Sequence, residues 1–335
     1  MNLLICGGYG YIGSKILEII SNNMKYKDWN VTVIDNWSYG RGMTSVYEYF
    51  KKEIKNLDTF CFDISDSDEI ITNKLNDIVI GTDYVINLCS LTQVPSTHLH
   101  EKYIIDGVKN LAHSILTHNN RIKKIIDISS TSIYGSVKID NYNAKEPYSE
   151  SIYPDPVNSL HNYASSKLYA EKVWQSSNFK SLPFTTLRLS TNIGYAIGLR
   201  YNQFINEFII NAIVGRQTIV PGAKTNVRPF IHVEDVANII LYLLDNSDIL
   251  NGEVLNVGSE DLNPTLDELY NYIAQILYRK YKIKGKYEFA IEKDKNVLQE
   301  SYLIDFTKFN NFIEYNVNYD FEKTTIDFMN KMGFK

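Results

Sequence analysis

The sequence has few cysteines, no excess of positive charge and no long apolar run. Its three cysteines, Cys6, Cys61 and Cys89, form no CxxC pair and have no metal-ligand spacing, so we predict no metal site and interpret them as reduced core residues. The formal net charge of -5 provides no basic field for nucleic acid or a membrane surface. No apolar stretch reaches membrane-spanning length, and the first residues lack the basic region of a signal peptide. We therefore expect a cytoplasmic globular protein that binds neither nucleic acid nor membrane.

A glycine-rich turn follows the first apolar run. Gly7, Gly10 and Gly13 recur every third residue in MNLLICGGYGYIGSKILEII, between a strand-like and a helix-like segment. Such a turn brings backbone N–H groups and the positive end of a helix to one point, which suits a pyrophosphate, although glycines also end strands for purely structural reasons. Asp35 ends the run VTVID, 22 residues after Gly13. A carboxylate there binds ribose hydroxyls and repels a 2′-phosphate, so the predicted cofactor is NAD rather than NADP.

Short apolar runs alternate with helical patterns up to about residue 190. The strand-like runs are NLLICG, NVTVIDN, DTFCFD, YVINLCS, IKKIIDISS and FTTLRLS. The alternation predicts an α/β fold with a doubly wound parallel sheet, of the Rossmann type, covered by helices on both faces. After Ser190 the alternation stops. We expect residues 1–190 to form the NAD-binding domain, with 231–258 returning to it, and residues 191–230 and 259–335 to form a smaller C-terminal substrate lobe.

Tyr163 and Lys167 lie four residues apart in the helical pattern NYASSKLYAEKVWQSS. Residues at this spacing share one helix face, and the cation lowers the pKa of the phenol from ~10 toward the range of a general base. Upstream, IIDISSTSIYG is a buried-looking strand that ends in hydroxyl side chains, which can hydrogen-bond a substrate oxygen. A Tyr–Lys pair alone is equally compatible with an exposed helix surface. It indicates a catalytic site only together with the hydroxyl-ended strand and the glycine turn.

These three features, in this order, resemble the extended short-chain dehydrogenase/reductase family. The resemblance covers nearly the whole chain and points to the nucleotide-sugar epimerase/dehydratase branch, with only a loose likeness to UDP-glucose 4-epimerase. It rests on the motifs GGYGYIG, DYVINLCS, SSTSIYG, TLRLSTNIG, VRPFIHVEDVA and NVGS. The family implies NAD as cofactor, a nucleotide-diphosphate sugar as substrate, and a homodimer that pairs the helices expected at 101–118 and 162–177.

The resemblance also implies the roles of individual residues. Tyr163, as phenolate, removes a proton from a sugar hydroxyl at C4, Ser130 holds that oxygen, and Lys167 lowers the tyrosine pKa and binds the nicotinamide ribose. Thr131 replaces Ser130 if the strand register shifts by one residue. The predicted cofactor contacts are Gly7, Gly10, Tyr11, Ile12, Gly13, Asp35, Asn36, Asp63, Ile64, Leu88, Tyr163 and Lys167. The predicted substrate contacts are Gln93, Thr131, Thr191, Asn192, Arg200, Asn206 and Arg228.

The residues after Ser130 bear on the reaction. Water-eliminating relatives resemble one another in carrying Asp-Glu directly after the catalytic hydroxyl, and decarboxylating relatives keep the Glu, whereas this chain has Thr131-Ser132. Without an acid/base pair at C5 and C6, the hydride returns to the other face of the 4-keto sugar, which is 4-epimerisation. A nucleotide-sugar 4-dehydrogenase or an unusual dehydratase stays open. The intact set Ser130, Tyr163 and Lys167 argues against a non-catalytic NAD-binding protein.

His232 and Asp235, in IHVEDV, have the composition of a catalytic dyad. The segment is a strand that leads into a helix, with Asp235 near the helix N-terminus. We therefore predict a packed core histidine rather than a catalyst.

Overall fold

The computed structural model describes residues 1–38, 42–90, 99, 101–135, 147–153, 162–290 and 301–335. At its centre lies a seven-stranded sheet with the spatial order β10-β6-β5-β4-β1-β2-β3, and all neighbouring strands run parallel. The strands are β1 (Asn2–Cys6), β2 (Asn30–Ile34), β3 (Leu57–Phe60), β4 (Tyr84–Asn87), β5 (Lys124–Ser130), β6 (Phe184–Leu189) and β10 (Glu253–Val257). The predicted doubly wound parallel α/β sheet is confirmed.

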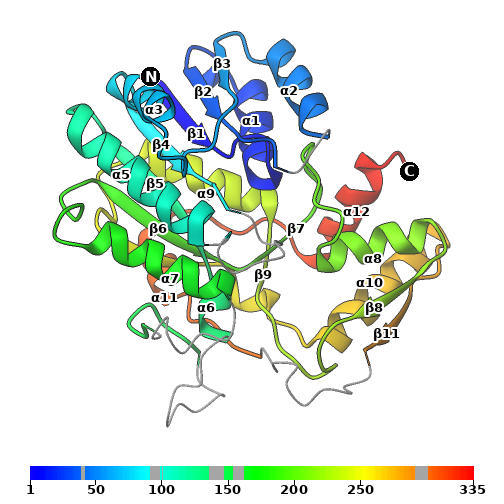
Figure 1. Cartoon of the computed structure of the whole chain (residues 1–335). Coiled ribbons are helices and arrows are strands. Elements are labelled where there is room, and N and C mark those ends of the chain that lie inside the picture. Colours follow the sequence, from blue (N-terminus) through cyan, green and yellow to red (C-terminus); the bar gives the residue numbers. More distant parts are fainter. Residues whose placement is uncertain (39–41, 91–98, 100, 136–146, 154–161, 291–300) are drawn as a thin grey trace.

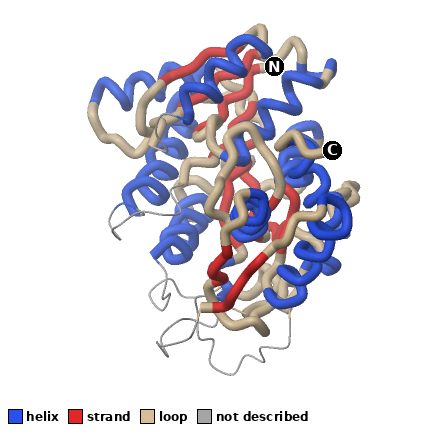
Figure 2. Tube along the Cα trace, turned by 90° about the vertical axis from the view of Figure 1, so that its right-hand side faces the viewer, coloured by secondary structure: helices blue, strands red, loops and turns tan. Residues whose placement is uncertain are grey.

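Helices cover both faces of the sheet, which explains why its central strands are apolar throughout. Every residue of β4 and β6 is buried, whereas β3 at the sheet edge exposes alternate residues. One face is covered by α1 (Tyr11–Asn22), α2 (Gly42–Glu53) and α9 (Val233–Asp245), and the other by α3 (Glu69–Ile80), α5 (Gly107–His118) and α7 (Asn162–Gln175) (Figure 1). Turned by 90°, the strands form a central band between helices (Figure 2).

Two elements differ from the sequence-based expectation. The helix expected at 101–118 begins with a π-helical segment, Glu101–Asp106, before α5. Helix α2 was not predicted at all. Its sequence GMTSVYEYFKKE opens with glycine, and no acidic residue stands in its first turn, so the usual start signals are missing.

A smaller group of elements packs around its own hydrophobic cluster, beside the sheet. It contains α8 (Phe204–Ile213), α10 (Leu266–Tyr281) and α12 (Phe321–Lys331), together with the parallel pair β8 (Gln217–Val220) and β11 (Lys286–Phe289). A second short pair, β7 (Thr191–Ile193) and β9 (Phe230–His232), lies where the chain passes between the two groups. Helix α10 starts with a capping box, in which Thr265 and Glu268 satisfy each other's backbone N–H groups.

The chain crosses between the two groups more than once. Strand β10 joins the sheet beside β6, and α9 packs against α1. Tyr302, Phe306 and Phe309 belong to the cluster on the sheet, although they lie within the stretch 259–335 that was expected to form the lobe. Short α6 (Ser132–Gly135) and α11 (Thr307–Phe312), with the 3-10 helices Met24–Tyr26 and Glu260–Leu262, complete the order of the described elements.

The cysteine interpretation was wrong for one of the three residues. Cys6 is buried and Cys89 partly buried, but Cys61 is exposed, because it follows the end of the edge strand β3. No helix in the described ranges is long and apolar enough to span a membrane.

Candidate active site

A cavity of about 1190 Å³ lies along the carboxyl ends of the strands. The strand order reverses between β1 and β4, and parallel α/β sheets bind ligands at such a point. The volume exceeds that of most single-ligand pockets, so the cavity has room for a dinucleotide and a second molecule. Its wall combines the glycine turn, the ends of β2, β4 and β5, the start of α7, and residues 197–204 next to β7.

The glycine turn has the geometry that a phosphate site requires. Gly7 adopts φ 77°, a left-handed conformation that favours glycine, and its N–H donates to the carbonyl of Ile34 at 2.7 Å. A Cβ on Gly13 would lie 2.5 Å from the carbonyl oxygen of Gly8, so only glycine lets α1 pack this closely. Helix α1 has Gly10 as N-cap with no side-chain acceptor, which leaves its first N–H groups for an anion.

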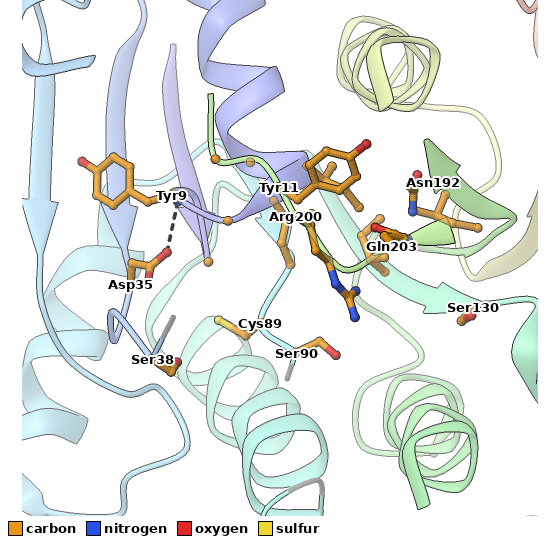
Figure 3. Close-up of a pocket in the computed structure, with 18 of the residues that line it drawn as sticks. Tyr9, Tyr11, Asp35, Ser38, Cys89, Ser90, Ser130, Asn192, Arg200 and Gln203 are labelled. Carbon is orange, nitrogen blue, oxygen red and sulfur yellow. Dashed lines mark hydrogen bonds between the residues drawn. The ribbon is translucent and has the colours of Figure 1, made fainter. Parts of the chain in front are cut away.

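The Asp35 carboxylate stands beside the glycine turn at the end of β2. It accepts the N–H of Tyr9 at 3.0 Å (Figure 3) and that of Trp37 at 2.9 Å. Burial is the main cause that raises the pKa of Asp35, and the two backbone N–H bonds oppose it. Next to it, the Asn36 amide donates to Asp63 at 3.0 Å. These contacts hold the acidic group in one position at the dinucleotide end of the cavity.

The three predicted catalytic side chains share one part of the cavity wall. Ser130 is the last residue of β5, and its Oγ accepts the N–H of Ser132 at 3.1 Å. On α7, the Lys167 ammonium donates to the carbonyl of Ile128 and lies 5.9 Å from the centre of the Tyr163 ring. Strand β5 and helix α7 therefore bring together a hydroxyl, a phenol and an ammonium.

A buried ion pair fixes α7 against the sheet. Glu171 on α7 and Arg188 on β6 are both fully buried, and their carboxylate and guanidinium meet at 2.7 Å. Glu171 also accepts the hydroxyl of Ser129, and Arg188 donates to the Tyr134 hydroxyl at 2.6 Å. The pair thus links the helix that carries Tyr163 to the strand that ends in Ser130. Sequence reasoning missed it, although an arginine inside the apolar run FTTLRLS was a visible signal.

All twelve predicted cofactor contacts line the cavity, and so do Thr191, Asn192, Arg200 and Arg228 of the predicted substrate contacts. The structure does not bring two others there. Thr131 is buried and its hydroxyl donates to the carbonyl of Leu189 at 3.2 Å, so of the two neighbouring hydroxyls it is Ser130 that faces the cavity. Asn206 is fully buried and its amide bonds other protein groups. Gln93 lies outside the described residues.

The far side of the cavity carries the predicted residues Asn192 and Arg228, together with three residues that the sequence did not single out: Gln203, Phe204 and Tyr302. The Arg228 guanidinium lies 5.6 Å from the Tyr302 ring centre and 5.9 Å from that of Phe204. Asn192 and Gln203 each keep a buried amide oxygen that has no hydrogen-bond partner among the described residues (Figure 3). Such groups suit a ligand with hydroxyl donors and a diphosphate.

Residues 3–258 match the family described as "NAD dependent epimerase/dehydratase family". The chain belongs to this family. Both the resemblance drawn from the motifs and the NAD cofactor are thereby confirmed, since the family is NAD-dependent.

Proteins of similar sequence have names that give different reactions. The chain is 23% identical to a GDP-6-deoxy-D-talose 4-dehydrogenase of Aggregatibacter actinomycetemcomitans, over 88% of this chain and 86% of the relative. It is 25% identical to a dTDP-glucose 4,6-dehydratase of Mycolicibacterium smegmatis, over 78% of this chain and 73% of the relative.

Solved structures with the same fold likewise belong to enzymes that catalyse different reactions. The UDP-glucuronic acid 4-epimerase from Bacillus cereus, with UDP-glucuronic acid and NAD, superposes with a TM-score of 0.79 at 19% identity and covers 99% of each chain. The dTDP-glucose 4,6-dehydratase DesIV from Streptomyces venezuelae gives 0.78 at 19% identity, over 99% of this chain and 98% of that one. These likenesses show the fold, and the reaction within the family stays open.

Proposed function

We propose that the protein is an NAD-dependent nucleotide-sugar 4-epimerase. The observation that carries this proposal is the composition of the cavity wall around Ser130, Tyr163 and Lys167. Among the described residues of that wall, the only carboxylates are Asp35 and Asp63, and both belong to the dinucleotide end. Elimination of water needs an acid and a base at neighbouring sugar carbons, whereas 4-epimerisation needs only the hydroxyl, phenol and ammonium.

The residues present fit NAD. The free N–H groups at the start of α1 suit its pyrophosphate, Asp35 suits its adenosine ribose, and Lys167 suits the ribose at the other end. When bound, NAD supplies the acceptor that takes the C4 hydride and returns it.

The side chains handle the proton. Tyr163 accepts the proton of the C4 hydroxyl while Ser130 donates a hydrogen bond to that oxygen, and the ammonium of Lys167 stabilises the phenolate. The sugar becomes a 4-keto sugar. Its C4 then accepts the hydride on the opposite face, and Tyr163 returns the proton to the oxygen, so no atom is gained or lost. The Thr131 hydroxyl is already donated to Leu189, and the Ser132 side chain does not ionise, so neither residue replaces the missing acid pair.

The remaining assignments are part of the same proposal. The planar guanidinium group of Arg228 binds the diphosphate of the sugar nucleotide through two hydrogen bonds, and Thr191 and Asn192 contact the sugar. Gln93, which follows β4 in the sequence, is assigned to the sugar as well. We further propose a cytoplasmic homodimer that pairs α5 and α7. We also propose a division into an NAD-binding domain and a substrate lobe with the boundaries predicted above, except that residues 302–313 pack on the sheet.

A nucleotide-sugar 4-dehydrogenase is the second candidate. The relative named as a GDP-6-deoxy-D-talose 4-dehydrogenase, whose match covers 88% of this chain, favours it. It would use the same first half-reaction and then release the keto sugar and NADH.

Product analysis separates these reactions. The protein is incubated with NAD and a panel of UDP-, GDP-, CDP- and dTDP-sugars that includes UDP-glucuronic acid. We expect a product of unchanged mass, an inverted C4 centre by NMR, and no accumulation of NADH. A product that has lost water indicates a dehydratase, and one that has lost two hydrogens with equivalent NADH indicates a dehydrogenase. Either result contradicts the proposal.

The Tyr163→Phe variant tests the assigned base. We expect kcat to fall by roughly 10²- to 10⁴-fold while NADH binding persists, because only the proton-transfer group is removed. Tyr169→Phe is the matched control, since Tyr169 lies on the same helix with its side chain 39% exposed. Full activity of Tyr163→Phe would exclude this mechanism.

A further inference from the structure

Residues 194–203 form a loop, here called the cover loop, which lies against the glycine turn. A Cβ on Gly198 would stand 2.8 Å from the carbonyl oxygen of Tyr9 and 2.9 Å from that of Gly10, so the two backbones are in direct contact. The Gly198 N–H donates to Ser14 Oγ on α1 at 2.9 Å. Ile197 to Gln203 also line the cavity. The cover loop therefore closes the cavity on the side where the dinucleotide pyrophosphate would lie.

Three residues, here called the clasp, hold the cover loop in place. The Tyr11 hydroxyl donates to the carbonyl of Gly194 at 2.5 Å and accepts the Asn206 amide at 3.2 Å. Asn206 Oδ1 in turn accepts the Gly194 N–H at 3.1 Å. Asn206 is fully buried, and burial raises the pKa of Tyr11, so the phenol stays a neutral donor. The clasp consequently ties α1, the cover loop and α8 together.

Arg200 is the cation that the cover loop carries. Its carbonyl accepts the Asn206 amide at 3.3 Å, and its side chain points into the cavity below the start of α1 (Figure 3). Among described residues, the cations that line the cavity are Lys167, Arg200 and Arg228. Lys167 is bonded to the carbonyl of Ile128, and Arg228 lies with Tyr302 and Phe204 on the far side. NAD and a sugar nucleotide each carry a diphosphate, so each of the two arginines, Arg200 and Arg228, can be assigned to one of them.

We propose that the clasp fixes the cover loop over the NAD pyrophosphate, that Arg200 neutralises this group, and that NAD is therefore retained between turnovers. The assignment moves Arg200 from the substrate, where sequence reasoning placed it, to the cofactor. It rests on the proposed function in one respect: an epimerase regenerates NAD in place and needs no exchange, whereas a dehydrogenase must release NADH.

The Tyr11→Phe variant removes only the hydroxyl of the clasp. We expect bound NAD to dissociate roughly ten-fold faster or more, because a buried carbonyl and a buried amide lose their partner. The readouts are the NAD content of the purified protein, measured after denaturation, and the rate at which labelled NAD replaces bound NAD. Tyr9→Phe is the matched control. Tyr9 lies in the same turn, but its hydroxyl bonds Thr59 on β3 and not the cover loop. Equal exchange rates in the two variants would overturn the clasp.

Arg200→Gln and Arg228→Gln separate the two diphosphates. We expect Arg200→Gln to lose NAD on purification and to weaken NAD binding roughly ten-fold, and Arg228→Gln to weaken only the sugar nucleotide. If Arg200→Gln raises KM for the sugar nucleotide and leaves NAD exchange unchanged, the assignment of Arg200 is wrong.

The measurements of NAD content and NAD exchange use the protein and NAD without a sugar nucleotide. Retention in the wild type with faster exchange in Tyr11→Phe supports the clasp, whatever the product analysis shows. Wild-type protein that purifies without NAD and exchanges it freely overturns the proposed retention. Epimerisation is decided separately, by the mass and configuration of the product.

Discussion

At the scale of single residues, Asp35 is held by burial and by two backbone hydrogen bonds. Its side chain is only 6% exposed, and each carboxylate oxygen accepts one backbone N–H. Tyr9 belongs to the glycine turn, so the hydrogen bond from Tyr9 couples the position of the carboxylate to the phosphate site. The carboxylate of Asp35 therefore presents its oxygens to a bound ribose in a fixed orientation.

We expect the Asp35→Asn variant to bind NADPH better relative to NADH. The substitution removes the charge that repels a 2′-phosphate, and a charge pair about 4 Å apart near a protein surface is worth about 1–4 kcal/mol. The NADPH/NADH preference should therefore shift by roughly ten-fold or more, measured by fluorescence titration with each reduced cofactor. Asp58→Asn, on an exposed position of β3, is the control. An unchanged preference would remove Asp35 from the ribose site.

The sequence predicted the cofactor side of the site better than the substrate side. Gly7, Gly13 and Asp35 act through local geometry, namely a turn and the end of a strand, and local geometry can be read from spacing. Tyr302 and Gln203 reach the cavity only because distant segments fold over it. No pattern around them indicates this.

At the scale of elements, His232 joins β9 to α9. Its Nδ1 accepts the N–H of Glu234 at 3.2 Å as the N-cap of α9, and its ring stacks on Tyr319 with centres 3.7 Å apart. The predicted core histidine is confirmed, since His232 is fully buried. Asp235 is in the first turn, as expected, but its carboxylate accepts the N–H groups of Asn318 and Tyr319 instead of capping the helix.

His232 should make folding stability fall in acid. Burial, and secondly the charge of Lys15, lower the pKa of His232 to about 3. The unfolded chain binds this proton near pH 6.5 and the folded chain does not, so the free energy of unfolding is largest above about pH 6.5. It then falls by up to about 1.4 kcal/mol per pH unit toward pH 3.

The His232→Asn variant tests this dependence, because asparagine is also a good N-cap but does not titrate. We expect a lower free energy of unfolding than wild type at neutral pH, and a shallower slope below about pH 6.5, from urea titrations across this range. A slope identical to that of the wild type would show that His232 is not the group responsible.

Element boundaries show where sequence patterns stop being informative. The sequence indicates a helix near residues 66–76, whereas α3 covers Glu69–Ile80, because apolar residues keep helical spacing up to Gly81. Adjacent side chains of an extended strand point to opposite faces, so the choice between Ser130, the last residue of β5, and Thr131, the residue after it, depended on the register. Only the pairing of Ser130 with Leu189 in the sheet fixes it.

At the scale of the whole molecule, the C-terminal segment ties the smaller group to the sheet. Asp235 on α9 accepts the Tyr315 hydroxyl at 2.8 Å, and Lys331 on α12 reaches Glu18 on α1 at 3.3 Å. Strand β10 and residues 302–313 return to the sheet. Neither group is therefore a continuous piece of chain, and neither can separate from the other without losing packing.

We expect one cooperative unfolding transition despite the length of 335 residues. The tryptophans Trp29, Trp37 and Trp174 all lie in the sheet region, whereas far-UV circular dichroism reports helices of both groups. Urea unfolding curves from fluorescence and circular dichroism should coincide. A loss of circular dichroism before the change in fluorescence would show that the smaller group unfolds independently.

The late entry of β10 has a consequence for the protein during its synthesis. Roughly 70 residues separate β6 from the strand that covers it, which at about 5–20 residues per second leaves the edge of β6 open for several seconds. An open, flat apolar edge invites pairing with other nascent chains. Strand β6 carries Thr185, Thr186 and the charged Arg188, and the partner of Arg188, Glu171, has already been made. The charge of Arg188 is therefore paired before β10 has been made, whereas the backbone edge of β6 is closed only when β10 pairs with it.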